Sequence, residues 1–417
     1  MPGFTFLHAA DLHIDSPLVG LNRYEGAPVE EIRQASRRAF EKLVRLAKDE
    51  HVAFVILAGD VFDGDWKDYN TGVFLNRELA SLEHAGIRVY LVHGNHDAEG
   101  QMTQKLRLPP NSHAFAHGAP ETVLFDEHQV ALHGQSFAEQ KVTKNLANGY
   151  PLRRAGFFNI GVLHTALEGR EGHLPYAPCS VSDLVAKGYD YWALGHVHKR
   201  EEVSKSPWIV FPGNLQGRHA RETGAKGCTL VRVLDGTVKE VRHVPLDLVR
   251  WVSIVHDVTG ITSPELAIEQ LALEITKEVK EAGDRLVVAR VRAYGVADLP
   301  HLAAEPHRFR AELVSRVTSL AGHRVWLEKV LSDVQSPETH SAGTLASLAV
   351  LDSILLELAT APTNDLPEVA RTLSGKLGKD APLGLESPFS PDAVARARTQ
   401  AIELLRWRLK RPKARRP

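Results

Sequence analysis

The chain has 417 residues, long enough for about two or three domains, and its 43% hydrophobic and 24% charged residues are typical of a soluble globular protein. Fifty Lys and Arg residues against 51 Asp and Glu residues give a net charge of −1, so no overall field attracts nucleic acid or a membrane. Two cysteines, Cys179 and Cys228, exclude a disulfide scaffold and a cysteine-based zinc finger, and they fit a reducing compartment.

Short apolar runs alternate with amphipathic stretches in the first 245 residues. The runs are too short for helices and predict buried strands at Phe4–His8, Val52–Leu57, Arg88–Val92, Phe158–Leu163 and Tyr191–Leu194. Apolar residues three or four positions apart predict helices over Val29–Glu50 and Tyr69–His84. Strands alternating with helices indicate an α/β layered core, in which loops at the carboxyl ends of the strands face a common crevice.

A second unit of alternating elements follows. We predict strands at Trp251–Val258, Arg285–Tyr294 and Arg324–Val334, and helices at Pro264–Ala282 and Pro306–Leu320. The ends of these strands carry no polar cluster, so the unit is expected to be an accessory domain with a β-α-β-α-β order. The predicted domains are therefore 1–247, 248–336 and a helical C-terminal segment, 337–417.

The C-terminal segment combines an apolar helix, Thr344–Thr360, a linker rich in Pro and Gly over 361–391, and a last helix, Asp392–Lys410. From Ala393 to the end, nine Lys and Arg residues against one Glu give a charge of +8. This basic tail could neutralise nucleic-acid phosphates, or it could be a solvated end. The apolar helix could instead dock in a groove of a partner.

Neither a signal peptide nor a membrane span is predicted. The first eight residues lack a basic region followed by an apolar one. The most apolar stretch, Thr344–Ala361, contains Asp352 and Glu357 and therefore reads as a helix of a soluble protein. We expect a cytoplasmic protein that does not bind a membrane.

Five polar clusters follow the predicted strands of the first domain. Each alone has an ordinary explanation, such as a capping Asp or a turn. Together they supply carboxylate, amide and imidazole groups at the ends of neighbouring strands, a donor set that suits two divalent cations of intermediate softness, Mn²⁺, Fe²⁺, Co²⁺ or Zn²⁺, rather than Mg²⁺ or Ca²⁺. The clusters are Asp11-x-His13, Gly59-Asp60-x-x-Asp63, Gly94-Asn95-His96-Asp97, His164-Thr165 and Gly195-His196-x-His198.

This order of clusters resembles the calcineurin-like metallophosphoesterase superfamily. Longer stretches look like the YhaO-type DNA repair exonucleases, relatives of the SbcD nuclease subunit that works with SMC-like ATPases. They are Asp11–Pro17, Tyr176–Cys179, Tyr189–Lys199 and Pro212–His219. The resemblance is strong over residues 4–245, and for the accessory domain it rests only on the order of elements. It implies an α/β (α+β) fold, a four-layer metallophosphoesterase β-sandwich flanked by helices.

The resemblance also implies roles for individual residues. The first cation would be held by Asp11, His13, Asp60 and His198. The second would be held by Asp60, Asn95, His164 and His196, with Asp60 shared. His96 would be the general acid, oriented by Asp97. Mn²⁺ is the expected metal.

The roles of Asp63, Arg218 and His219 stay open. Asp63 stands where archaeal and eukaryotic relatives have a histidine, as it does in the SbcD branch. A second histidine contact to the transition state is therefore not expected at this position, and Asp63 is expected to order its loop. Arg218 and His219 either contact a substrate phosphate bidentately or order theirs.

The expected function is a two-metal DNA nuclease acting on DNA ends beside an SMC-like ATPase. ATP use would belong to that partner, because the chain lacks a Gly-x-x-x-x-Gly-Lys-Ser/Thr loop. Relatives dimerise through helices, and Tyr69–His84 is a candidate for a homodimer contact. Two alternatives remain at this point: a small-molecule or cyclic-nucleotide phosphoesterase, and a non-catalytic protein that binds DNA ends.

Overall fold

The computed structural model describes residues 3–16, 26–64, 69–100, 106–168, 176–299 and 306–335. These residues form two compact units, and the chain passes from the first to the second between Arg250 and Trp251. Residues 26–27 and 219–221 group with the second unit. The predicted helices Thr344–Thr360 and Asp392–Lys410, the linker and the basic tail lie outside the described residues.

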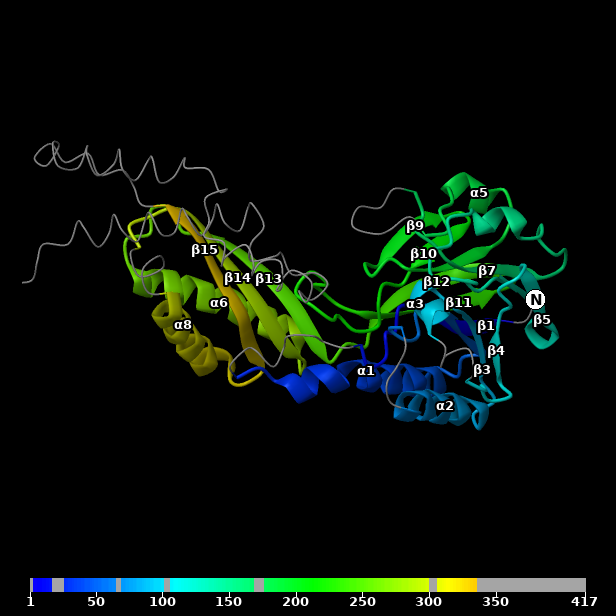
Figure 1. The fold of residues 1–417 in the computed structure, drawn as a ribbon, viewed down its shortest axis with the longest axis horizontal. Helices are drawn as coiled ribbons and strands as arrows, with labels where there is room; N and C mark the ends of the chain where they lie inside the picture. The colour runs from blue at the N-terminus through cyan, green and yellow to red at the C-terminus, as the bar shows by residue number, and fades with distance from the viewer. Residues whose placement is uncertain are drawn as a thin grey trace, which may run out of the picture. The chain divides into compact units, whose positions relative to one another are not determined.

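The first unit contains two six-stranded sheets (Figure 1). One sheet has the order β12-β11-β1-β2-β3-β4, in which β1 to β4 are parallel and β11 is antiparallel to both its neighbours. Because β1, β2 and β3 are parallel and adjacent, their carboxyl ends meet at one edge. The strands are β1 (Phe4–Ala9), β2 (Phe54–Ala58), β3 (Arg88–Val92), β4 (Ser112–Ala114), β11 (Gly227–Leu234) and β12 (Thr237–Pro245).

The second sheet has the order β5-β6-β7-β8-β10-β9. Its four central strands are parallel, and β5 and β9 pair antiparallel at the two edges. The carboxyl ends of β7 and β8 therefore also lie side by side. The strands are β5 (Glu121–Phe125), β6 (Val130–Gly134), β7 (Phe158–His164), β8 (Tyr191–Gly195), β9 (Glu201–Lys205) and β10 (Trp208–Phe211).

An aromatic core joins the two sheets. The rings of Phe6 and Phe54 stack with centroids 5.0 Å apart, and Tyr191 of the other sheet meets Phe6 edge-on at 5.3 Å. On the outer face of the first sheet, α1 (Val29–Asp49) and α2 (Tyr69–Glu83) bury their apolar sides. The outer face of the second sheet is covered by 3-10 turns, loops and the short helix α5 (Val181–Val185). The layers confirm the predicted flanked β-sandwich.

The second unit has the predicted β-α-β-α-β order. Helix α6 (Pro264–Ala282) has Pro at its first position. The preceding residue, Ser263, caps this end of the helix, because its Oγ accepts from the Leu266 N–H. Gly283, with φ 66°, caps the other end. The sheet order is β13-β14-β15, with β14 and β15 parallel. The remaining elements are β13 (Val249–Asp257), β14 (Leu286–Val296), α8 (Pro306–Ala321) and β15 (Val325–Gln335).

The predicted elements that fall within the described residues are all present, with ends that match or are shifted by one or two residues. The sequence missed strands β4, β5, β6, β9, β10, β11 and β12, which are more than half of the strands in the two large sheets. Strand β12 alternates half-buried and exposed residues, so no apolar run marks it. A search of the described helices finds none long and apolar enough to cross a bilayer.

Candidate metal centre

The predicted site residues come from five loops, each at the carboxyl end of a strand. Asp11 and His13 follow β1, Asp60 and Asp63 follow β2, and the short helix α3 (Asn95–Glu99) follows β3. From the other sheet, His164 ends β7, and His196 and His198 follow β8. Gly195 allows the two sheets to meet here, because a Cβ at this position would overlap the Ala58 carbonyl oxygen. The parallel topology thus gathers distant parts of the sequence at one place.

Four of the predicted ligands have left-handed backbone conformations, which cost energy outside glycine. Their φ angles are 51° at Asp11, 43° at His13, 50° at Asp60 and 97° at His196. Backbone hydrogen bonds between loops hold them: Asp11 N donates to Gly59 O and His13 N to Asp60 O, both at 3.0 Å. Non-glycine residues held in this way are concentrated at functional sites.

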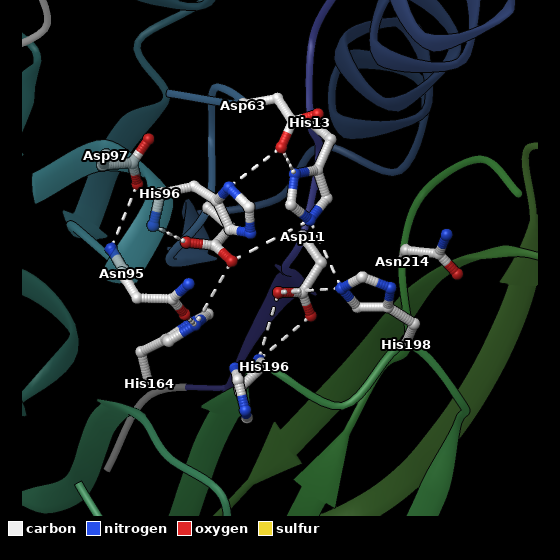
Figure 2. Close-up of polar contacts among 12 residues, drawn as sticks. Asp11, His13, Asp63, Asn95, His96, Asp97, His164, His196, His198 and Asn214 are labelled. Atoms are coloured by element: carbon white, nitrogen blue, oxygen red, sulfur yellow. Dashed lines mark hydrogen bonds and ion pairs between the residues drawn. The ribbon is translucent and has the colours of Figure 1, made fainter. Parts of the chain in front are cut away.

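One group of side chains consists of Asp11, His13 and His198, and one ligand atom from each lies within 4.8 Å of the others. We call it group A. The Nε2 atoms of His13 and His198 are 3.3 Å apart, and His198 Nε2 lies 3.9 Å from Asp11 Oδ1. Asp11 also accepts the His196 N–H at 3.1 Å from both oxygens, so its carboxylate lies between the two histidines of β8's loop (Figure 2).

A second group consists of Asp60, His164 and His196, again within 4.8 Å of one another. We call it group B. His164 Nδ1 lies 3.0 Å from Ala58 O, to which it can only donate. Its other nitrogen, Nε2, lies 3.1 Å from Asn95 Oδ1 and 3.4 Å from Asp60 Oδ2. In a neutral His164 all three of these atoms are acceptors, and a cation among them would satisfy them together.

Asp60 lies between the two groups. Its Oδ2 is 3.4 Å from His164 Nε2 and 3.8 Å from His13 Nε2, while Oδ1 accepts the His96 N–H at 3.0 Å. Six of the seven residues predicted as ligands therefore make up groups A and B, and the seventh, Asn95, contacts His164 of group B. The structure places none of the seven predicted ligands away from this site.

Burial and mutual charges set the protonation of these groups. Burial raises the pKa of Asp11 and lowers that of His13 to about 3, so His13 is a neutral imidazole able to ligate. Burial also opposes ionisation of Asp60, but the neighbouring imidazoles, His164 first, hold its pKa well below the usual range. Burial opposes protonation of His164 in turn, yet Asp60 outweighs it and raises the pKa of His164 to about 9. A proton thus occupies the place in group B that a cation would take.

The prediction that Asp97 orients His96 is wrong. Both Asp97 oxygens accept backbone N–H groups, from Val61 at 3.1 Å, Phe62 at 2.9 Å and Gly94 at 3.1 Å, so this carboxylate ties the loop after β2 to helix α3. Its position one residue after His96 in the helix turns it to another face.

Asp63 contacts the His96 ring instead. Its Oδ1 lies 2.9 Å from His96 Nδ1 and 3.4 Å from His13 Nδ1, and Figure 2 shows the carboxylate between the two rings. Burial opposes protonation of His96, but the hydrogen bond to Asp63 outweighs it and raises the pKa of His96. Asp63 therefore holds the imidazolium form, and its place at the site does not merely order a loop.

Sequence reasoning missed Glu222. This buried carboxylate lies 2.7 Å from His198 Nδ1, and Arg218 stands next to it, with Nη2 at 3.4 Å from Glu222 Oε1 and Nη1 at 3.6 Å from Asp63 Oδ2. Arg218 thus orders the surroundings of the site, and its contact with a substrate phosphate stays a prediction. No sequence motif identifies Glu222, because its contact with His198 forms only when the chain folds.

Comparison with known proteins agrees with this arrangement. The family model described as calcineurin-like phosphoesterase matches residues 4–200, and the model described as metallophosphoesterase YhaO, middle domain, matches residues 251–335. The first match identifies residues 4–200 as a calcineurin-like phosphoesterase domain. An uncharacterized metallophosphoesterase YhaO of Bacillus subtilis is 35% identical over 291 residues, which cover 69% of this chain and 71% of that protein. The chain belongs to the YhaO family of metallophosphoesterases.

More distant relatives carry a more specific name. DNA double-strand break repair proteins Mre11 from Methanopyrus kandleri and Sulfurisphaera tokodaii are each 26% identical, over 61% and 58% of this chain and 59% and 62% of theirs. Among solved structures, a dimetal phosphatase from Danio rerio matches with a TM-score of 0.36 and 12% identity, over 59% of this chain and 98% of that one. Family membership makes the protein a hydrolase of phosphoesters, and the family depends on a pair of metal ions.

Proposed function

We propose that this protein is a two-metal phosphodiesterase that cleaves DNA at or near its ends, with Mn²⁺ as the metal. The observation that carries the proposal is the pair of groups A and B, in which Asp60 of group B lies 3.4 Å from His164 Nε2 and also 3.8 Å from His13 Nε2 of group A. Each group offers one carboxylate and two imidazoles, and the amide oxygen of Asn95 lies next to group B. This mixture of oxygen and nitrogen donors fits Mn²⁺ better than Mg²⁺.

Each group would hold one cation, with Asp60 bridging. When bound, the pair supplies Lewis-acid activation of water and charge neutralisation for the phosphodiester. The chain's own residues supply orientation: Ala58 O keeps His164 Nδ1 as a donor, which directs Nε2 toward Asp60. Most of the donor side chains are buried, which strengthens their interaction with a charged substrate.

His96 would protonate the leaving oxygen. With Nδ1 donating to Asp63 at 2.9 Å, the second proton of the imidazolium is on Nε2 and available to the departing sugar alkoxide. The hydrogen bond to the Asp63 carboxylate raises the pKa of His96, which favours the protonated form of the ring. After transfer, the neutral ring keeps its Nδ1 hydrogen bond and its orientation.

DNA as substrate is supported by the Mre11 names of the distant relatives and by the second unit, which a small-molecule phosphoesterase would not need. In this proposal residues 1–247 form the nuclease domain and residues 248–336 cap it. Residues 337–417 dock on a separate SMC-like ATPase. A homodimer and a cytoplasmic location remain predictions from the sequence.

A panel of substrates with Mn²⁺ tests the proposal. Single-stranded, blunt, hairpin and covalently closed circular DNA are compared with cyclic nucleotides and a bis-nitrophenyl phosphodiester. We expect cleavage of linear or hairpin DNA that EDTA abolishes. Turnover of cyclic nucleotides without DNA cleavage would favour a small-molecule phosphoesterase, and two bound metals without any turnover would favour a DNA-end-binding protein.

A further inference from the structure

Glu222 lies behind His198, on the side of the ring opposite group A. The carboxylate oxygen Oε1 is 2.7 Å from His198 Nδ1. The other ring nitrogen, Nε2, is 3.3 Å from His13 Nε2 and 3.9 Å from Asp11 Oδ1. The His198 ring therefore extends from a buried carboxylate to the atoms of group A. In a neutral ring, a proton on one nitrogen leaves the other nitrogen with its lone pair.

Obligate donors surround the rest of the carboxylate. Oε2 accepts from Asn214 Nδ2 at 2.9 Å and from the Arg218 backbone N–H at 2.7 Å, and Arg218 Nη2 approaches Oε1 at 3.4 Å. None of these partners can act as an acceptor. A carboxylate group accepts hydrogen bonds, so His198 Nδ1, which is protonated in one tautomer of the ring and not in the other, is expected to carry the proton of its 2.7 Å contact with Oε1.

The backbone of His198 is fixed as well. The ammonium of the buried Lys226 donates to His198 O at 2.7 Å, and Asn214 N donates to the same oxygen at 3.4 Å. Ring and main chain are thus held from one side by residues 214–226. None of these contacts involves group B, whose His164 is oriented by the Ala58 carbonyl.

We propose that Glu222 is a positioning residue for group A, which keeps the His198 proton on Nδ1 and so leaves the Nε2 lone pair for the cation. The inference rests on the metal binding of the proposed function and not on its substrate. Carboxylates that accept from the second nitrogen of a ligating histidine commonly change metal affinity by about 10–100-fold.

A glutamine at this position makes the idea testable. Glu222→Gln keeps the size of the side chain but must place its NH₂ at one of the two oxygen positions. At Oε2 the amide would face two N–H donors that cannot change. At Oε1 its near neighbour is His198 Nδ1 at 2.7 Å, and Arg218 Nη2 lies farther away at 3.4 Å. The imidazole can respond by moving its proton to Nε2, where it points at the cation site. We therefore expect the substitution to switch the tautomer of His198.

The experiment is a Mn²⁺ titration followed by electron paramagnetic resonance and calorimetry, with the thermal midpoint of each protein measured in EDTA. For Glu222→Gln we expect one of two Mn²⁺ to bind about 10–100-fold more weakly, the other to bind as in the wild type, and the midpoint in EDTA to stay close to the wild-type value. Glu202→Gln is the matched control, since Glu202 pairs with Arg200 outside both groups. Equal loss of both cations with a lowered midpoint indicates a merely structural role and overturns the inference, as do two wild-type affinities.

A second measurement uses wild-type protein and does not depend on how the variant folds. In protein loaded with Zn²⁺ and labelled with ¹⁵N-histidine, the His198 ring is assigned by the signal lost in His198→Gln. We expect a slowly exchanging proton on Nδ1. A proton on Nε2 overturns the inference even if two metals bind. Wild-type protein that binds fewer than two Mn²⁺ overturns the proposed function and this inference together.

Discussion

Groups A and B contain the same kinds of side chain but are held in different ways. In group B, the orienting partner of His164 is a backbone carbonyl, Ala58 O, at the end of a central strand. In group A, the orienting partner of His198 is a side chain, Glu222, from a loop more than twenty positions away. A carbonyl in a sheet persists whatever the side chain is, whereas a carboxylate can be lost by one substitution. Group B is therefore built into the fold, and group A depends on an outer layer of side chains.

A substitution of Asp60 should affect both groups, because Asp60 belongs to group B and its Oδ2 also lies 3.8 Å from His13 Nε2 of group A. Asp60→Asn removes the bridging charge and is expected to abolish binding of both cations and phosphodiester turnover. By contrast, His198→Gln and His164→Gln should each leave one cation bound. Metal stoichiometry by atomic emission after gel filtration distinguishes the three variants. One cation retained tightly in Asp60→Asn would show that the groups are independent sites.

In the proposed chemistry His96 donates a proton and is a member of neither group A nor group B. His96→Gln is expected to lower kcat for DNA cleavage by about 10²–10⁴-fold while two Mn²⁺ remain bound.

Asp63→Asn removes the group that raises the pKa of His96, so His96 should lose its proton at a lower pH. The high-pH limb of the kcat profile should therefore move to lower pH. An unshifted profile in Asp63→Asn contradicts the assignment of Asp63 as the partner of His96.

Asp97→Asn should instead lower the free energy of unfolding, since the Asp97 oxygens accept from backbone N–H groups.

The pH dependence of metal binding should differ between the halves. In the metal-free protein His164 is protonated below its pKa of about 9, and a cation in group B must displace that proton. Binding to group B should therefore strengthen with pH, by about 100-fold between pH 6 and pH 8. His13, with a pKa of about 3, has no proton to lose in this range.

Calorimetry in buffers of different ionisation enthalpy measures this directly. The His198→Gln variant isolates group B, and the His164→Gln variant isolates group A. A steeper pH dependence in the group A protein than in the group B protein would reverse the assignment of the displaced proton.

The smallest expected effect concerns the place where the sheets meet. Gly195→Ala puts a Cβ against the Ala58 carbonyl oxygen, the same carbonyl that orients His164. We expect the free energy of unfolding in urea to fall by about 1–3 kcal/mol and group B to bind its cation more weakly than group A. Gly118→Ala is the control, because a Cβ there has open space around it. Equal weakening of both groups would show that the junction supports the whole centre.

The sequence predicted well those elements whose signal is local. Helix α6 has the predicted ends because Pro264, its capping serine and the following glycine are short-range determinants. Strands such as β12 escaped detection because their alternation has meaning only beside β11. For the site, the seven ligand candidates carried a recognisable order along the chain. The partner of His96 could not be recognised in this way. Asp63 and Asp97 are equally plausible neighbours of His96 in the sequence, and only the folded loops distinguish them.

The amino-acid sequence by itself determined the inventory of chemistry: carboxylate, amide and imidazole groups follow successive buried strands, and this depends on residue type and spacing alone. Only the tertiary structure decided how each group is oriented, since an imidazole has two nitrogens and a carboxylate two oxygens. Which of them faces a cation depends on contacts such as Glu222 with His198 and Asp63 with His96, formed between segments far apart in the chain. Spacing along a polypeptide carries no information about such contacts until folding brings the segments together.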